Sequence, residues 1–511
     1  MLAGRTKRAF SNGLVSIAGK LILMVAPFFL RTVIIAKLGI EYLGLNSLFS
    51  SLLSMLSLTE LGFGSAVIFS MYKPMAEGND QEVCALLNFY KNIYRAVGGI
   101  ITVVGLVFLP FLKSFVVSDY PENINIYIVY LIYLINTVVS YFLFAYKNSV
   151  FIASMRNDID SIITTICHLA MYLAQIVVLL LVKNYYIYAV CLPLFTIINN
   201  IIKSYIVDKK YPQYRSKGRL TKEKKHDIIT RVGALIGNKI GGVVFASVDS
   251  LVISAFLGLA VLGKYSNYYL IFTSVSSIMA ITFSSIQAII GNSMVCRNED
   301  ENYKTFNELF FINTWLTIFC SCCFACLYQP FIKIWVGEEN QLNIIITFLL
   351  ALYYFVRGIG QVGYTFKEAA GMWREDWLKP YISVIANLCL NIILVKVIGL
   401  SGVILSSVFA LAFIELPWET RVLFKAYFKK STRGYYARIL KAVLVAVVSI
   451  MISFLICNLL PESIIGLILR GLVCTVIPNL LIVLVYFRTE EFKSAKSRIS
   501  EILKRKKSKS V

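Results

Sequence analysis

The chain has 511 residues, of which 58% are apolar and only 15% are charged, and its mean hydropathy is +0.73. A single buried core cannot hold this much apolar surface, so lipid must be part of the solvent. The formal net charge of +22 does not indicate nucleic-acid binding, because the basic residues gather in loops that face anionic lipid. Composition excludes a large soluble domain and predicts an all-α polytopic membrane protein.

Fourteen apolar spans follow one another along the chain, and each approaches the roughly 20 residues that a helix needs to cross the hydrocarbon core. They are residues 14–36, 44–70, 95–113, 124–145, 161–182, 185–206, 231–257, 266–290, 308–330, 342–364, 380–397, 402–424, 440–460 and 464–487. The first span is too long for a signal-peptide core, so we expect it to remain a membrane helix. Residues 73–95 mix charges with apolar side chains and are expected to lie along the interface as an amphipathic helix.

Basic residues define the expected orientation. With the amino terminus in the cytoplasm, the inner loops and tails hold most of the 50 Lys and Arg residues. The positive-inside rule therefore predicts that both termini are cytoplasmic. The segment 209–231 and the tail from Arg488 are the most basic stretches, and both are expected to lie on the anionic lipids of the inner leaflet.

An internal repeat indicates two lobes. Residues 17–47 match residues 236–266 at 11 of 31 positions without a gap, at an offset of 219 residues. This offset spans six helices, an even number, so both copies enter the membrane from the same side, as in transporters built from parallel repeats. We predict a first lobe at 1–208, a basic linker at 209–230, a second lobe at 231–428, and two further helices with a basic tail at 429–511.

Charged residues inside the spans are the candidate site residues, because such residues are rare in lipid and usually face a cavity or a partner. They are Lys20, Arg31, Glu60, Lys239, Asp249, Arg357, Glu415 and Arg470. Lys20 and Arg31 are eleven residues apart, about three helical turns, so they share one face at different depths, which suits an anion that crosses the bilayer. Two alternatives stay open: Arg31 and Asp249 form only a structural ion pair, and the lysines reach the inner head groups.

Local sequence also predicts irregular helices in the second half. Gly358 and Gly360 follow Arg357 and favour a bend, and Pro417 is expected to kink the helix that carries Glu415. Kinks beside buried charges are typical of moving helices, although proline is common in membrane helices in any case.

Catalytic and metal sites are not expected. The sequence has no GxxxxGK[ST] phosphate loop, and the longest outer loop holds only Asp119 and Glu122, so an enzyme is not predicted. Most of the 11 cysteines lie in apolar runs and only two histidines are present, so neither a disulfide framework, a metal site nor another cofactor is expected. Secondary transport between two lobes is the remaining class.

The plan of six, six and two helices and several short motifs carry a family resemblance. The motifs are the run from Arg31 to Gly39 with Leu43-Gly44 after it, the stretch from Leu58 to Ala66, the inner-loop run from Lys73 to Asn79, and Asp249 followed by Leu257-Gly258 and Tyr265. In these features the chain resembles the bacterial polysaccharide (Wzx-type) flippases of the multidrug/oligosaccharidyl-lipid/polysaccharide exporter superfamily.

The resemblance implies that undecaprenyl-diphosphate-linked oligosaccharide units are flipped from the inner to the outer leaflet of a bacterial plasma membrane, for capsule, O-antigen or similar polymers. Glycosyltransferases and a polysaccharide polymerase are the expected partners. The candidate substrate-binding residues are Arg31, Arg357, Lys20 and Lys239, and the candidate coupling or counter-ion residues are Glu60, Asp249 and Glu415. Two alternatives stay open: a lipid II-type flippase, which differs only in its cargo, and a multidrug cation antiporter, against which five intramembrane cations and three acids weigh.

Overall fold

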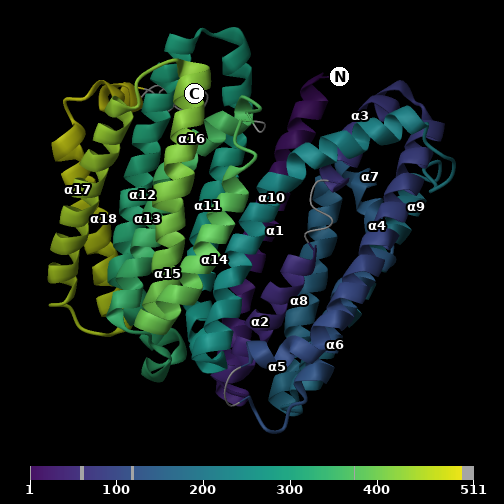
Figure 1. The fold of residues 1–511 in the computed structure, drawn as a ribbon, viewed down its shortest axis with the longest axis horizontal. Coiled ribbons are helices and arrows are strands. Elements are labelled where there is room, and N and C mark those ends of the chain that lie inside the picture. Colours follow the sequence, from purple (N-terminus) through teal and green to yellow (C-terminus); the bar gives the residue numbers. More distant parts are fainter. Residues whose placement is uncertain (1, 58–62, 117–119, 373–374, 498–511) are drawn as a thin grey trace, which may run out of the picture. The chain divides into compact units, whose positions relative to one another are not determined.

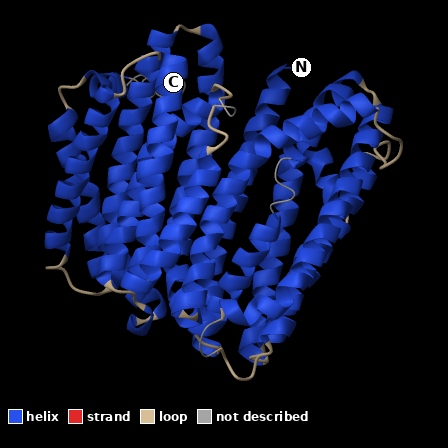
Figure 2. Ribbon diagram, in the orientation of Figure 1, coloured by secondary structure: helices blue, strands red, loops and turns tan. Residues whose placement is uncertain are grey.

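The computed structural model of the protein describes residues 2–57, 63–116, 120–372 and 375–497, without the side chains of residues 2–16, 231, 233–242, 246 and 288. Within these ranges the regular elements are all helices (Figure 2). The chain divides into two compact units, Met1–Ser266 and Asn267–Val511, called here the N-terminal and the C-terminal unit. Residues 231–266, which the repeat assigns to the second lobe, therefore pack with the N-terminal unit, and the lobe boundaries themselves stay a prediction.

The N-terminal unit is a bundle in which helices distant in sequence pack together (Figure 1). Its helices are α1 Leu2–Lys37, α2 Ile40–Leu56, α3 Phe63–Glu77, α4 Asp80–Phe108, α5 Leu112–Phe115, α6 Ile126–Phe142, α7 Asn148–Ala153, α8 Asn157–Leu181, α9 Tyr185–Lys210, α10 Lys222–Leu257 and the first turns of α11 Leu259–Cys296. Helix α1 packs on α8, α9 packs on both α6 and α8, and α2 packs on α10. Asn79, Asn125 and Asn184 each cap a helix start, because their side-chain oxygens accept from backbone N–H groups of the first turn.

The C-terminal unit is built around α12. Its elements after α11 are α12 Glu299–Val336, α13 Ile344–Ala369, α14 Lys379–Ile398, α15 Leu400–Phe409, the π-helical segment η5 Ala410–Glu415, α16 Leu416–Val422, the π-helical segment η6 Leu423–Phe428, α17 Arg433–Cys457 and α18 Ile464–Tyr486. Helix α12 packs on α13, α17 and α18. Aromatic rings fill part of this core: the ring of Phe306 lies 5.2 Å from those of Phe366 and Phe428 and 5.6 Å from that of Tyr435.

Eleven helices in the described part of the chain are long and apolar enough to cross a membrane. A twelfth is formed if α6 and residues 145–153, which meet at an angle of 49°, make one bent span. These twelve coincide with twelve of the predicted spans, and the all-α membrane-spanning fold is confirmed. The other two predicted spans, 44–70 and 231–257, run through residues or side chains outside the described set, so the count of fourteen is not confirmed.

The predicted interfacial helix at 73–95 is not formed as a separate element. Its first residues end α3, and its remainder begins α4, which continues unbroken to Phe108. Gly78, with φ of +71°, makes the turn between them. The buried positions Val83, Leu87 and Tyr90 continue at helical spacing through Tyr94, so this face packs against protein rather than lipid head groups.

The internal repeat appears in the N-terminal unit as two turns with similar backbone geometry. Gly39 joins α1 to α2 with φ 119° and ψ 168°, and Gly258 joins α10 to α11 with φ 87° and ψ 171°. The Gly39 N–H donates to the Ile34 carbonyl at 3.2 Å, and the Gly258 N–H donates to the Ile253 carbonyl at 3.1 Å. Both pairs are related by the offset of 219 residues, so the two copies share backbone geometry as well as sequence.

Candidate functional site

The two repeat turns pack directly against each other. A Cβ atom added to Gly44 would lie 2.1 Å from the carbonyl oxygen of Leu259, and one added to Gly263 would lie 2.3 Å from that of Ile40. Gly44 and Gly263 are repeat equivalents, as are Ile40 and Leu259, so the contact is reciprocal, as it is across a two-fold axis. Only glycine permits this approach of backbone to backbone.

Arg31 lies beside this contact. Its side chain is half-buried on α1, and its Nη1 donates to the carbonyl oxygen of Ser266 at 2.7 Å and to the Ser266 hydroxyl at 3.1 Å. The Ser266 hydroxyl donates in turn to the Gly263 carbonyl at 2.8 Å. Both acceptors belong to Ser266, so these two bonds fix the orientation of the guanidinium at the start of α11.

A tyrosine-rich network lies near Arg31 and was not predicted from the sequence. The Tyr133 hydroxyl donates to the Asn46 side chain at 3.0 Å, and the Asn46 amide donates to the Tyr188 hydroxyl at 3.4 Å. Tyr185 stacks on Tyr188, with ring centroids 5.4 Å apart, and Tyr188 is close enough to interact with the charge of Arg31. The signal that was available is an asparagine inside an apolar span together with the Tyr185-Tyr186-Ile187-Tyr188 run.

The other predicted site residues of the N-terminal unit take different positions. Lys20 is exposed on α1, whereas Asp249 is only 4% exposed on α10. Glu60 and the side chain of Lys239 lie outside the described residues. Their assigned roles therefore stay predictions.

Arg357 is an exposed side chain on α13 of the C-terminal unit, and it interacts electrostatically with Glu415. The helix around it is continuous from Ile344 to Ala369, so the glycines do not interrupt it. Gly358 instead lets α12 approach, since an added Cβ would lie 2.7 Å from the Thr317 side chain. The Asn313 amide donates to the Gly358 carbonyl at 2.8 Å across the same contact.

Glu415 ends the π-helical segment η5, immediately before α16. Pro417 has no N–H to donate within this helix, and a widened π-helical turn is one way in which a helix accommodates such a gap. The irregularity expected at Pro417 is therefore present, as π-helical geometry. The Ser383 hydroxyl donates to Glu415 Oε1 at 2.8 Å, which fixes the carboxyl group against α14.

A buried ionic cluster lies one turn beyond Glu415. Lys367 pairs with Asp376, and Lys379 pairs with Glu419, while Lys379 also lies 3.4 Å from Asp376. Lys367 and Asp376 are fully buried, and Glu368 lies 3.6 Å from Lys367. These contacts join three carboxylates and two ammonium groups in one buried place, and such a group of titratable side chains in a membrane protein is a candidate site for a proton or a cation.

This cluster was not predicted from the sequence. The predicted spans ended at 364 and began again at 380, so Lys367, Asp376 and Lys379 were assigned to a loop. Glu419 lay inside a predicted span but was not singled out. Its spacing of four from Glu415 places both carboxylates on one helix face, and that spacing was the available signal.

No protein-family model and no curated protein sequence matches the chain. Among solved structures, the lipid II flippase MurJ in an inward closed conformation aligns with 93% of this chain and 99% of its own, with a TM-score of 0.68 and 15% identity. An inward-facing multidrug resistance MATE family transporter of the MOP superfamily aligns with 82% of this chain and 99% of its own, with a TM-score of 0.63 and 12% identity. A MOP superfamily transporter from Pyrococcus furiosus aligns with 83% of this chain and 97% of its own, with a TM-score of 0.52 and 13% identity. This chain has the fold that these flippase and transporter structures share.

Proposed function

We propose that the protein is a flippase that moves undecaprenyl-diphosphate-linked oligosaccharides from the inner to the outer leaflet. The observation that carries the proposal is Arg31, a half-buried arginine inside a membrane helix whose guanidinium is held in place by two hydrogen bonds to Ser266. Arginine binds phosphate oxygens through two parallel hydrogen bonds, and a diphosphate presents several such oxygens. Arg357, Lys20 and Lys239 are the further cations assigned to the substrate.

The fold supports a transporter rather than an enzyme. The structure that aligns with 93% of this chain is named a lipid II flippase, whereas the MATE transporter aligns with 82%. Outward movement of a negative charge across an inside-negative membrane is favourable by about 2.3 kcal/mol of free energy for each 100 mV of potential. The diphosphate therefore moves without ATP. Alternating access of two lobes in a bacterial plasma membrane, with both termini cytoplasmic, completes the proposal. Glycosyltransferases supply the substrate and a polymerase consumes the product.

Two alternatives have support of their own. A lipid II-type flippase uses the same diphosphate chemistry and differs only in its sugars and peptide. A multidrug cation antiporter is favoured by the buried carboxylates Asp376 and Glu419 and the half-buried Glu415, since such groups bind protons or cations. In the flippase, these carboxylates and the predicted Glu60 and Asp249 would couple an ion to lipid movement.

The test measures transfer of a fluorescent undecaprenyl-diphosphate oligosaccharide across proteoliposomes, with and without an inside-negative potential. Wild-type protein should move the lipid, and Arg31→Ala should slow transfer by about tenfold to a hundredfold, because a hydrogen bond to a charged group contributes about 1.5–3 kcal/mol. Arg31→Lys keeps the charge but loses the bidentate hydrogen bonding, so its transfer rate should be intermediate. Arg156→Ala, which removes an arginine paired with Asp158 between spans, is the matched control.

The outcomes separate the candidates. If neither the oligosaccharide lipid nor lipid II moves while a cationic dye exchanges for protons, the antiporter replaces the flippase. If lipid II alone moves, the lipid II-type flippase replaces the polysaccharide flippase. Elution volume and thermal unfolding of each variant establish that a loss of transfer is not a loss of folding.

A further inference from the structure

Cysteines from three helices meet inside the C-terminal unit. Cys322 and Cys326 lie on successive turns of α12, Cys474 lies on α18, and their three Sγ atoms are all within 4.8 Å of one another. All three are buried, with exposed fractions of 0%, 3% and 0%. Cys457, the last residue of α17, is equally buried and its thiol contacts those of Cys326 and Cys474.

The hydrogen bonds from these thiols to the backbone are long. Two of the thiols make hydrogen bonds to backbone carbonyls, of Ser449 and of Cys322, at the long distance of 3.9 Å. A thiol is a weak donor, so these contacts hold the sulfur atoms only loosely. In a tetrahedral site with Zn–S bonds of about 2.3 Å, neighbouring sulfur atoms lie about 3.8 Å apart. The cluster therefore approaches that geometry and reaches it through movements of about an ångström.

We propose that Cys322, Cys326 and Cys474 bind one soft metal ion, Zn²⁺, as thiolates, with the neutral Cys457 thiol beside them. Binding releases one proton from each of the three thiols, because thiolates and not thiols are the ligands. Two positive charges and three negative charges leave a net charge of −1 on the site. Three thiolates around Cu⁺ would leave −2, a larger charge to bury.

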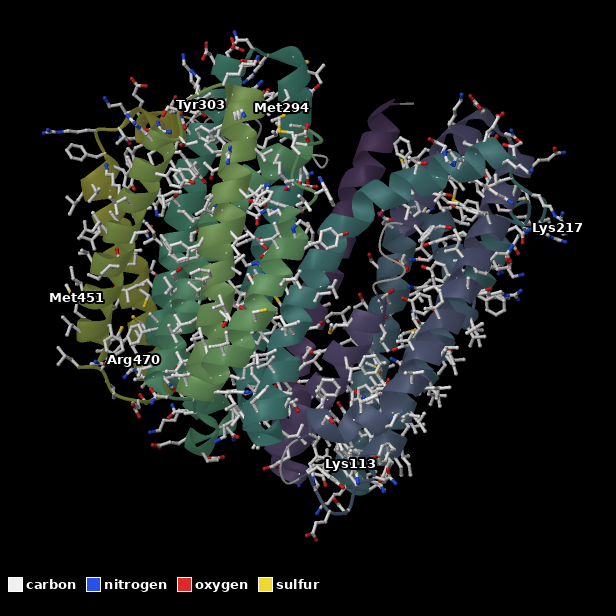
Figure 3. The ribbon with its side chains drawn as sticks, viewed as in Figure 1. Lys113, Lys217, Met294, Tyr303, Met451 and Arg470 are labelled. Atoms are coloured by element: carbon white, nitrogen blue, oxygen red, sulfur yellow. The ribbon has the colours of Figure 1, made fainter. Side chains whose placement is uncertain are left out.

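Arg470 supplies the balancing charge. It lies four residues before Cys474 on α18, so both project from one helix face, and it interacts electrostatically with Cys457 (Figure 3 labels Arg470). Its side chain is 7% exposed, and its Nη2 donates to the Leu460 carbonyl at 2.8 Å. Among the described residues its Nε, although buried, has no hydrogen-bond partner. A buried guanidinium with an open donor is stabilised by an anionic neighbour, which the metal-thiolate site would be.

The sequence expectation of no metal site rested on the lack of histidine and carboxylate ligands near the cysteines. The structure supplies thiols in their place, from positions 148 residues apart in the chain. The ion would join α12 to α18 and so tie the last two helices to the rest of the C-terminal unit. Because the site is sealed, it must take up its ion as the protein folds.

The experiment measures metal content in the full-length protein. Cells grown with added zinc or with added copper provide protein that is purified in detergent and washed with EDTA, and elemental mass spectrometry then counts the ions per chain. Wild type from zinc-supplemented cells should retain one Zn²⁺ per chain. Cys474→Ala should lose it, with affinity reduced by more than the roughly 10–100-fold that loss of an outer-shell partner costs. Cys326→Ser tests a second ligand.

Cys389→Ser and Cys296→Ser are the matched controls, because both cysteines are exposed and lie outside the cluster. Both should retain the ion. The proposal fails if wild type carries no more zinc than Cys474→Ala while both fold alike, if copper is retained in place of zinc, or if peptide mass spectrometry finds Cys474 in a disulfide. Thermal unfolding identifies a variant that has merely misfolded, and Cys326→Ser then provides the independent result. None of these readouts depends on lipid transfer.

Discussion

Lys379 and Glu419 form a buried ion pair whose side chains are only 6% and 8% exposed. Removal of one partner leaves an uncompensated charge in a region of low dielectric constant, which typically costs 3–5 kcal/mol. We therefore expect Lys379→Met to lower the free energy of unfolding in detergent by about this amount. The double variant Lys379→Met with Glu419→Gln should recover much of the loss, because removal of one positive and one negative charge leaves the net charge of the cluster unchanged.

The matched control is Lys429→Met, which removes an ion pair with Glu299 whose side chains are 67% and 46% exposed. Such surface pairs contribute about 0–1 kcal/mol, so this variant should unfold almost as the wild type does. Equal effects of Lys379→Met and Lys429→Met would contradict the view that the cluster is sealed from water.

Glu462 provides a pH-dependent prediction outside the membrane spans. Lys333 Nζ lies 2.6 Å from its carboxylate, and this hydrogen bond holds the pKa of Glu462 below the ordinary value of 4.5. The carboxyl pKa is lower in the folded than in the unfolded protein, so the pair stabilises the protein above the unfolded pKa and the contribution disappears as pH falls through the folded pKa. Because Glu462 is more than half exposed, we expect only a few tenths of a kcal/mol.

Thermal unfolding of wild type and Glu462→Gln between about pH 7 and pH 3 measures this contribution. The wild type should be slightly the more stable at pH 7, and the difference should vanish at the acid end. A difference in stability that stays constant over this range would show that the Lys333–Glu462 pair does not contribute to the pH dependence.

Single residues also show what a sequence can indicate and what it cannot, although the role assigned to Arg31 stays a prediction. The charge of Arg31 inside an apolar run was sufficient to single it out, because a charge in lipid is costly wherever the chain folds. Lys367 and Asp376 could not be recognised in the same way, because they lie between spans and become buried only through the packing of α13, α14 and α16. Burial of a loop residue depends on tertiary contacts that hydropathy does not contain.

At the scale of helices, the reciprocal contact between α2 and α11 places the strictest limit on side-chain size. Gly44→Ala and Gly263→Ala would each place a Cβ against a backbone carbonyl, at 2.1 Å and 2.3 Å, and a carbonyl cannot rotate away as a side chain can. The helices must then separate, and overpacking of this kind costs about 1–3 kcal/mol. We expect both variants to lower the thermal unfolding midpoint and to lower it by similar amounts, because the two sites are repeat equivalents.

Gly99→Ala in α4 is the control, since an added Cβ there meets nothing within 4 Å. It should be neutral or slightly stabilising, because alanine favours a helix over glycine by about 1 kcal/mol. If Gly44→Ala proves as harmless as Gly99→Ala, the close contact is not part of the folded protein in solution.

Helices were predicted best where hydropathy alone defines them. Twelve predicted spans match described helices, because a run of about 20 apolar residues has few other structures in lipid. The prediction of an interfacial helix at 73–95 was wrong. Its apolar stripe indicated that one face is buried, but it did not indicate that this face packs against protein rather than against the membrane interface. The π-helical geometry of Ala410–Glu415 was not foreseen, since a proline predicts an irregularity and not its form.

At the scale of the whole molecule, the repeat was the most informative sequence signal, and it also explains why residues 231–266 belong to the N-terminal unit. The reciprocal contact brings residues 259–263 against residues 40–44, so the second copy of the repeat packs with the first. Sequence similarity finds equivalent residues but does not say whether they touch. The cysteine cluster could not be predicted either, because nothing in the sequence spacing of Cys326 and Cys474 indicates that they lie close together.

Orientation in the membrane is the last property that the sequence predicts, and it decides the direction of transport. The segment 209–231 is rich in Lys and Arg and is assigned to the cytoplasm, whereas Glu122 lies in a loop assigned to the outside. Cysteines placed at Lys217 and at Glu122, both exposed, should therefore differ in their reaction with a membrane-impermeant maleimide applied to intact spheroplasts (Figure 3 labels Lys217). Glu122→Cys should react at once, and Lys217→Cys only after the membrane is opened, in a background where the exposed Cys296 and Cys389 are serine. The reverse pattern would mean that the protein has the opposite orientation in the bilayer. The proposed outward flippase would then have to be an importer of the same substrate.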